Sequence, residues 1–247
     1  MRIYRRTDRV WTWLAIAAST AVPGMCGPVA LQNATATFSQ TLGDNFFASK
    51  MIDGNFGGGL GQGWAIFNGS GALAQTSVFE TVADTGFAGG TQLTFTLSHL
   101  YDSGQHTVGR FRISVTTDAR TAFADGFQSG GDVSAAWTVL MPSSASGTNG
   151  PTLTILGDGS VLASGTNPAN SVYTVAASTT LTGITGVRLE VLEDASLPGS
   201  GPGRQPANGN FVLTEFEMSA DAAVPEPGSL VTVLSALGVL ALIAISD

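Results

Sequence analysis

Apolar and polar residues alternate along most of the chain between residues 31 and 220. Leu93, Phe95 and Leu97 alternate with polar residues, and many other stretches follow the same rule. Because successive side chains of a strand point to opposite faces, a period of two predicts half-buried antiparallel strands. The expected strands cover residues 35–39, 63–67, 76–82, 91–100, 108–117, 135–141, 153–156, 161–163, 171–177, 184–193 and 210–219.

Glycine-rich turns separate these short strands. An Asp-Gly pair within residues 157–160 joins two apolar runs, and glycine accepts the positive φ that a tight hairpin needs. Many short strands of this kind predict an all-β, jelly-roll β-sandwich with one core. Two loops, residues 53–63 and 198–210, are too rich in glycine or proline to be strands. We expect them to form the rim of a binding site.

The N-terminus has the pattern of a secretory signal peptide. Arginines at positions 2, 5, 6 and 9 precede the apolar residues 10–22, which are too few to span a bilayer comfortably. We expect residues 1–30 to be a signal peptide, with a signal helix that is removed on export. A lipidated Cys26 and a twin-arginine signal at Arg5 and Arg6 stay open as alternatives, as does a buried N-terminal helix.

Charge and cysteine content exclude several classes of function. Cys26 is the only cysteine, so a disulfide framework, a Cys-rich zinc site and a haem-attachment motif are excluded. Removing residues 1–30 takes away four of the ten basic and one of the eighteen acidic residues, which leaves a formal charge near −11. Such a surface repels phosphate backbones, so we expect no nucleic-acid partner.

The C-terminus combines a proline-rich motif with an apolar tail. Residues 224–229 read Val-Pro-Glu-Pro-Gly-Ser, and residues 230–245 carry no charge. This segment resembles the PEP-CTERM sorting signal of bacteria that make exopolysaccharide. The resemblance implies that an exosortase of the inner membrane recognises Pro225, Glu226 and Pro227 and processes a precursor held by a C-terminal hydrophobic helix. The mature form would lie at the cell surface or outside the cell. Family tails end in arginines, whereas this one ends in Asp247.

The central residues carry a second resemblance. Three stretches of the sequence are similar to discoidin-like, galactose-binding-like domains. They are the Ile-Asp-Gly-Asn sequence at 52–55, the Gly-Trp pair at 63–64 and the closing residues 213–218. A module of large bacterial proteins with cytochrome c-type segments is also similar, over residues 109–116, 183–190, 201–204 and 208–211. The resemblance implies a domain over residues 31–220, followed by a sorting segment over 221–247, and sugar binding through loops at one end.

A structural calcium ion is also implied by this resemblance. Its expected ligands are Asp53, Asn55 and Glu215, whose oxygen donors suit a hard cation. The alternative is that Asp53 caps a turn and Glu215 is a solvated strand residue.

Two residues are candidates for direct contact with a ligand. Trp64, beside the glycine-rich loop, offers an aromatic face for a sugar ring, and the alternative is a core tryptophan. Arg204, in the second loop, offers a fork for a carboxylate or a sugar hydroxyl, and the alternative is an arginine that is solvated or paired within the domain.

Other titratable residues support an enzyme less well. His99 and His106 flank a turn, where they would bind metal or act as acid and base only with further partners. A pair of catalytic glycosidase carboxylates could come from Glu190, Glu193 and Asp194. Because these residues cluster at the end of one strand, an exposed acidic turn is favoured.

The sequence therefore favours an exported, non-catalytic protein that associates with cell-surface or matrix polysaccharide, with a structural calcium ion. The alternatives are a structural or protein-interaction module of the envelope, and a divergent glycan-active hydrolase. The carbohydrate hypothesis comes from the resemblance alone.

Overall fold

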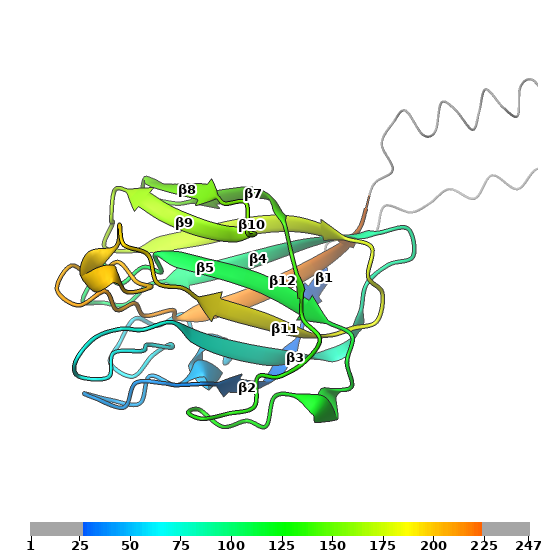
Figure 1. Cartoon of the computed structure of the whole chain (residues 1–247), viewed down its shortest axis with the longest axis horizontal. Coiled ribbons are helices and arrows are strands. Elements are labelled where there is room, and N and C mark those ends of the chain that lie inside the picture. Colours follow the sequence, from blue (N-terminus) through cyan, green and yellow to red (C-terminus); the bar gives the residue numbers. More distant parts are fainter. Residues whose placement is uncertain (1–26, 224–247) are drawn as a thin grey trace, which may run out of the picture.

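The computed structural model describes residues 27–223, which form two antiparallel sheets packed face to face (Figure 1). The first sheet has the order β1 (Gly27–Val29), β12 (Glu215–Ala222), β4 (Thr91–His99), β10 (Ser171–Thr179) and β7 (Pro142–Gly147). The second has the order β2 (Leu31–Ala36), β3 (Gln75–Thr85), β11 (Ile184–Val191), β5 (Arg110–Thr116), β9 (Ser160–Gly165) and β8 (Pro151–Ile155), with β6 (Thr138–Val139) also paired to β5. The expected all-β sandwich is confirmed.

Short connections join the two sheets along both sides. The chain passes from β1 to β2 at Ala30, and from β7 to β8 through residues 148–150. Three short 3-10 helices, η1 (Ala48–Met51), η2 (Arg120–Ala122) and η3 (Pro198–Ser200), lie in the longer connections.

Aromatic side chains from both sheets meet in the core. Phe79 of β3 stacks on Phe216 of β12 with ring centroids 5.2 Å apart. Phe111 of β5 stacks on Tyr173 of β10 at 6.2 Å. Each pair joins one sheet to the other, and these rings are fully or almost fully buried. Burial of large aromatic surfaces therefore holds the two layers together.

Most expected strands match the observed ones within about five residues. The expected strand 135–141 is reduced to the two residues of β6, and the expected strand 35–39 overlaps only the end of β2. The differences lie where alternation is weak or misleading. Residues 63–67 form no strand, only an isolated bridge between Trp64 and Leu213. Strand β7 was not expected, because its sequence of proline, serines, alanine and glycine has no apolar alternation.

The sandwich begins earlier than the sequence indicates. Gly27–Val29 pairs with β12, and the carbonyl of Ala30 accepts a hydrogen bond from Val82. Residues 27–30, which we assigned to the signal peptide, are therefore part of the folded domain. A three-residue strand containing glycine and proline has no periodicity that could reveal it.

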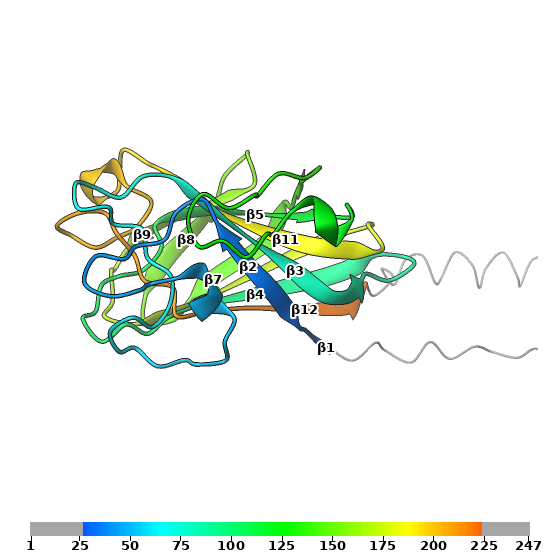
Figure 2. The same cartoon turned by 90° about the horizontal axis from the view of Figure 1, so that it is seen from below.

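Long connections gather at one end of the sandwich, and the chain enters and leaves at the other (Figures 1 and 2). We call the first end the loop end. It holds the connections 37–74, 100–109, 166–170 and 192–214. At the opposite end Gly27 lies across from Ala220, and Ala223 donates to the carbonyl of Gly90.

Three predicted features lie outside the described residues: the signal helix, the Pro225-Glu226-Pro227 motif and the apolar tail. Of the predicted signal peptide only residues 27–30 are described, and of the predicted sorting segment only residues 221–223. Within residues 27–223, no helix has the length and apolar character needed to cross a membrane.

Strand β1 provides a test of where the domain begins. A chain that starts at residue 31 lacks the pairing of β1 with β12 and the half-buried side chain of Val29. We expect its Tm to be lower by about 5 °C than that of a chain starting at residue 27, because a few lost backbone hydrogen bonds remove about 2 kcal/mol. Equal melting curves for the two chains would contradict the assignment of β1 to the fold.

Candidate functional site

The expected calcium ligands Asp53 and Glu215 come together at the loop end. Glu215, the first residue of β12, is only 4% exposed. Its Oε1 accepts a long hydrogen bond of 3.4 Å from the backbone of Gly54, and its Oε2 is buried without a partner. The alternative of a solvated Glu215 is therefore wrong. Burying a carboxylate oxygen without a hydrogen-bond partner destabilises the folded protein, and binding a proton or a cation at this atom would remove that cost.

Burial, together with the carboxylates of Asp53 and Glu217, raises the pKa of Glu215 to about 7 against the opposing hydrogen bond from Gly54. This perturbation shows that Glu215 has no compensating positive charge nearby. The residue thus titrates close to neutral pH.

Asn55 is placed differently from the other two residues. Its Oδ1 accepts a hydrogen bond from Gly57, and its Nδ2 donates to Gln62 at 2.7 Å, so its amide organises the glycine-rich loop. Asp53 accepts a hydrogen bond from Asn55 in an Asx turn, as the alternative interpretation expected. The pair Asp53 and Glu215 therefore fits a cation better than the full set of three. In residues 27–223 no group of three or more His, Cys, Asp or Glu side chains is arranged to hold a metal ion.

Trp64 does not present its ring to solvent, and its prediction as a sugar-stacking residue is wrong. The side chain is 0% exposed, packs edge-on against Phe211 at 5.2 Å, and donates from Nε1 to the carbonyl of Phe38. The closing chain segment before β12 covers it.

Arg204 is also buried, with an exposed fraction of 6%. Its guanidinium donates to the carbonyls of Gly165 at 2.7 Å and Thr166 at 2.9 Å. Arg204 thereby ties the β11–β12 connection to the β9–β10 connection. The same residue lies in the wall of a pocket at the loop end.

The two histidines contact different tyrosines. His99 lies 4.5 Å from the ring of Tyr173, and burial lowers its pKa to about 3 against a hydrogen bond with the carbonyl of Ser171. His106 lies edge-on to Tyr101 at 5.1 Å, and burial also lowers its pKa. Both rings are held neutral at physiological pH.

The acidic residues near the end of β11 are paired with arginines. Glu190 forms ion pairs with Arg112 at 2.8 Å and Arg188 at 3.1 Å, and Asp194 with Arg110 at 3.5 Å. Glu190 therefore lies in a cross-strand ladder on the outer face of the second sheet, not in an acidic turn. Hydrogen bonds from Ser196 lower the pKa of Asp194, which is the opposite of what a glycosidase acid requires.

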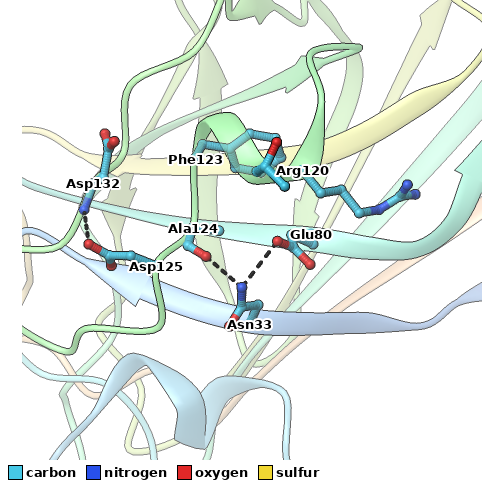
Figure 3. Close-up of a pocket in the computed structure, with 8 residues that line it drawn as sticks. Asn33, Glu80, Arg120, Phe123, Ala124, Asp125 and Asp132 are labelled. Carbon is cyan, nitrogen blue, oxygen red and sulfur yellow. Dashed lines mark hydrogen bonds between the residues drawn. The ribbon is translucent and has the colours of Figure 1, made fainter.

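A separate open groove of about 550 Å³ runs beside β2 and β3 (Figure 3). Asn33 projects from β2 and Glu80 from β3, while Arg120 of η2 extends along β3, where it binds the carbonyl of Thr81 and the carboxylate of Asp84. Thr121 also belongs to η2, and the segment after η2 contributes Phe123, Ala124, Asp125 and Asp132. The groove thus brings amide, carboxylate, guanidinium and hydroxyl groups together from three distant parts of the sequence.

The groove is built by a loop that covers the edge of β2. The backbone of Ala36 donates to Phe127 and accepts from Gly131, while Gly130 donates to Thr37. Thr35 Oγ1 accepts from Gly126. These bonds satisfy the free edge of β2 and hold the loop at a fixed distance from the sheet, so the groove is preformed.

Inside the groove, Glu80 is 7% exposed and accepts hydrogen bonds from the amides of Gln32 and Asn33. Asn33 also donates to the carbonyl of Ala124. Asn33 and Ala124 both have positive φ, 57° and 62°. For alanine this conformation is unfavourable, and the hydrogen bond from Asn33 helps to hold it.

Sequence reasoning did not find the groove. Its residues are scattered over a hundred positions, and no motif links β2 to the loop after η2. One signal was available: the Asp-Gly at 125–126 and the Gly-Gly-Asp at 130–132 mark a turn-rich loop with two carboxylates.

Neither the family models nor the curated proteins give a match to the chain. One similar solved structure comes from work on the multiple functions of the Streptococcus pneumoniae beta-galactosidase BgaA; it is 10% identical, with a TM-score of 0.43, over 76% of this chain and 89% of that one. Another is CBM32-3 from a family 31 glycoside hydrolase of Clostridium perfringens; it is 11% identical, with a TM-score of 0.42, over 76% of this chain and 94% of that one. Both likenesses are too weak to assign a function.

The raised pKa of Glu215 predicts a pH-dependent stability. The folded state holds this proton up to about pH 7, whereas the unfolded state loses it near pH 4.5. The free energy of unfolding therefore falls as the pH rises through this window. In chelator at pH 8, Glu215→Gln should be more stable than the native protein by about 3 kcal/mol, and at pH 4 the two should be equal.

The matched control is Glu217→Gln, which changes an exposed carboxylate two residues along the same strand. Denaturant unfolding at both pH values measures the difference. A stability difference between Glu215→Gln and the native protein that is the same at pH 4 and pH 8 would show that the fold does not raise the pKa of Glu215.

Proposed function

We propose that this protein is an exported, non-catalytic module that binds polysaccharide in the groove between β2, β3 and the loop after η2. The observation that carries the proposal is the preformed groove with its converging hydrogen-bonding side chains. Sugar hydroxyls require donors and acceptors at fixed positions, and here the edge-covering loop provides that rigidity.

The composition of the groove favours a sugar over other ligands. The Oδ1 of Asn33 and the carboxylate of Glu80 are acceptors, and Arg120 adds N–H donors beyond those that bind Thr81 and Asp84, as a polyhydroxylated ring requires. Phe127, two residues beyond Asp125, is 64% exposed and offers a flat apolar face. The acidic surface of the domain disfavours nucleic acid.

Binding rather than catalysis is supported by how the carboxylates are used. Asp125 accepts hydrogen bonds from the backbones of Phe127 and Asp132, and Asp132 accepts one from Ser134. Glu80 is held by two amides. Carboxylates that hold backbone N–H groups have little freedom to act as acid and base.

At the loop end we propose a galactose-binding-like arrangement in which calcium binds between Asp53 and Glu215. The support is the buried, unpartnered Oε2 of Glu215 beside a second carboxylate. Backbone carbonyls would supply the remaining oxygen ligands that calcium prefers. The ion would pin the glycine-rich loop to the first residue of β12.

Export and sorting are part of the same proposal. The signal peptide and the Pro225-Glu226-Pro227 motif imply an exosortase-like processing enzyme and a precursor held in the inner membrane by the C-terminal tail. Ala223 lies at the end of the sandwich opposite the loop end. A membrane anchor beyond this residue would leave the loop end directed away from the bilayer.

Glycan binding tests the groove. We expect residues 27–223 to bind at least one polysaccharide on a glycan array, and Asn33→Gly to weaken that binding about tenfold by removing an amide that faces the groove. Glycine keeps the positive φ of position 33. Asn149→Gly is the matched control, because Asn149 also has a positive φ but lies in the β7–β8 connection.

Melting curves establish that the variants are folded, and Phe127→Ala serves as a second variant because its exposed side chain lies on the edge-covering loop, although outside the groove lining. Weaker binding in Phe56→Ala, with no change in the groove variants, would move the sugar site to the loop end. A domain that binds no glycan would favour the structural envelope module.

Calcium binding is tested by thermal melting. At calcium concentrations about a hundredfold above Kd, the native protein should gain about 2.7 kcal/mol over the protein in chelator. Asp53→Ala and Glu215→Gln should lose this response, whereas Glu217→Gln should keep it. Melting curves of the native protein that do not change with calcium would show the calcium proposal to be wrong.

A further inference from the structure

Arg204 differs from every other arginine in the described part of the chain. Arg110, Arg112, Arg120 and Arg188 each contact a carboxylate within 4.0 Å. Arg204 is well buried, yet within residues 27–223 it forms no ion pair. Acidic residues outnumber basic ones in this protein, so the lack of a carboxylate at this position is unexpected.

The contacts of Arg204 satisfy hydrogen bonds without neutralising its charge. The guanidinium donates to two neutral carbonyls, of Gly165 and Thr166, and the backbone of Arg204 donates to Thr107. Carbonyl dipoles orient the planar group but leave a full positive charge in a poorly solvated place. Such a group attracts a carboxylate and can bind it in a bidentate manner.

A pocket of about 280 Å³ adjoins this arginine at the loop end. Its wall includes Ser164, Gly165, Asn167, Ser196, Pro206 and Arg204. None of the residues that line it is acidic; Asp194 accepts hydrogen bonds from Ser196 of the wall, and its other oxygen pairs with Arg110, which offsets its charge. The pocket is therefore a local positive site on a negatively charged protein.

We propose that this pocket binds a carboxylate-bearing sugar, a hexuronate residue of an acidic polysaccharide. Arg204 would bind the carboxylate, and the hydroxyl of Ser164 lies in the same wall as a partner for a ring hydroxyl. The hydroxyl of Ser196 donates to Asp194 and the amide of Asn167 donates to the carbonyl of Arg204, so each has one further hydrogen bond to offer: Ser196 as an acceptor and Asn167 as a donor. This site lies at the loop end, away from the groove beside β2, and does not depend on the groove function.

The pocket favours a sugar over an acidic peptide. Its wall combines hydroxyl and amide side chains with the apolar Leu197, Pro198 and Pro206, as the two kinds of face of a sugar ring require, and its volume suits a single ring. The net negative charge of the domain opposes a polyanion at long range, but at physiological salt this repulsion fades beyond roughly 8 Å. A direct pair with a buried guanidinium is screened much less.

The test is calorimetric titration of residues 27–223 with a galacturonate trisaccharide and with the neutral galactose trisaccharide. We expect the galacturonate to bind at least tenfold more tightly. Ser164→Asp places a competing carboxylate in the pocket and should weaken galacturonate binding at least tenfold. Ser164→Asn introduces a side chain of the same size and shape as Asp but without the charge, and should change the affinity less than twofold. Ser164 is exposed on β9, so both variants should keep the Tm of the native protein.

Arg204→Lys keeps the positive charge but loses the planar, bidentate guanidinium, and it should also weaken galacturonate binding at least tenfold. Its Tm shows whether the β9–β10 and β11–β12 connections remain held together. The groove variant Asn33→Gly should bind galacturonate as the native protein does, which separates this site from the proposed groove. Equal affinity for both trisaccharides, no binding of galacturonate, or an unchanged affinity in Ser164→Asp would overturn the proposal. So would binding of poly-glutamate in preference to galacturonate.

Discussion

The structure depends on the docking of its last strand into the interior of a sheet. Strand β12 lies between β1 and β4, so the first and last described strands pair with each other. Phe216 of this strand stacks on Phe79 across the sandwich and lies 6.0 Å from Phe95 in its own sheet. Neither the core nor the first sheet is complete until this distant segment arrives, which makes the fold dominated by long-range contacts.

The same closure decides which polar groups become buried. The segment leading into β12 covers Trp64 with Phe211 and carries Glu215 to the glycine-rich loop. Burying an aromatic ring here is favourable, whereas burying Glu215 is costly. A protein retains such a carboxylate when another requirement demands it, and a cation at the loop end is the requirement that we propose.

Sheet edges and charges account for the two proposed sugar sites. The edge of β2 is covered by a loop rather than by another strand, and the groove is the space that this cover leaves open. On the outer face of the second sheet, arginines and carboxylates neutralise one another in cross-strand pairs, and Trp137 lies over Arg188 at 5.3 Å. Arg204 lies outside this ladder. The groove and the Arg204 pocket therefore differ in charge, and we expect them to differ in the sugars they bind.

The sequence by itself determined the fold class, because strands such as β4 and β5 carry an alternation that only a half-buried strand explains. It also brought Asp53 and Glu215 together through a resemblance. Strands β1 and β7 carry too few apolar residues to be recognised locally. The burial of Trp64 and Arg204, and the groove around Asn33, were decided only by the tertiary structure. Burial depends on which distant segments cover a residue, and no local pattern of side chains records that.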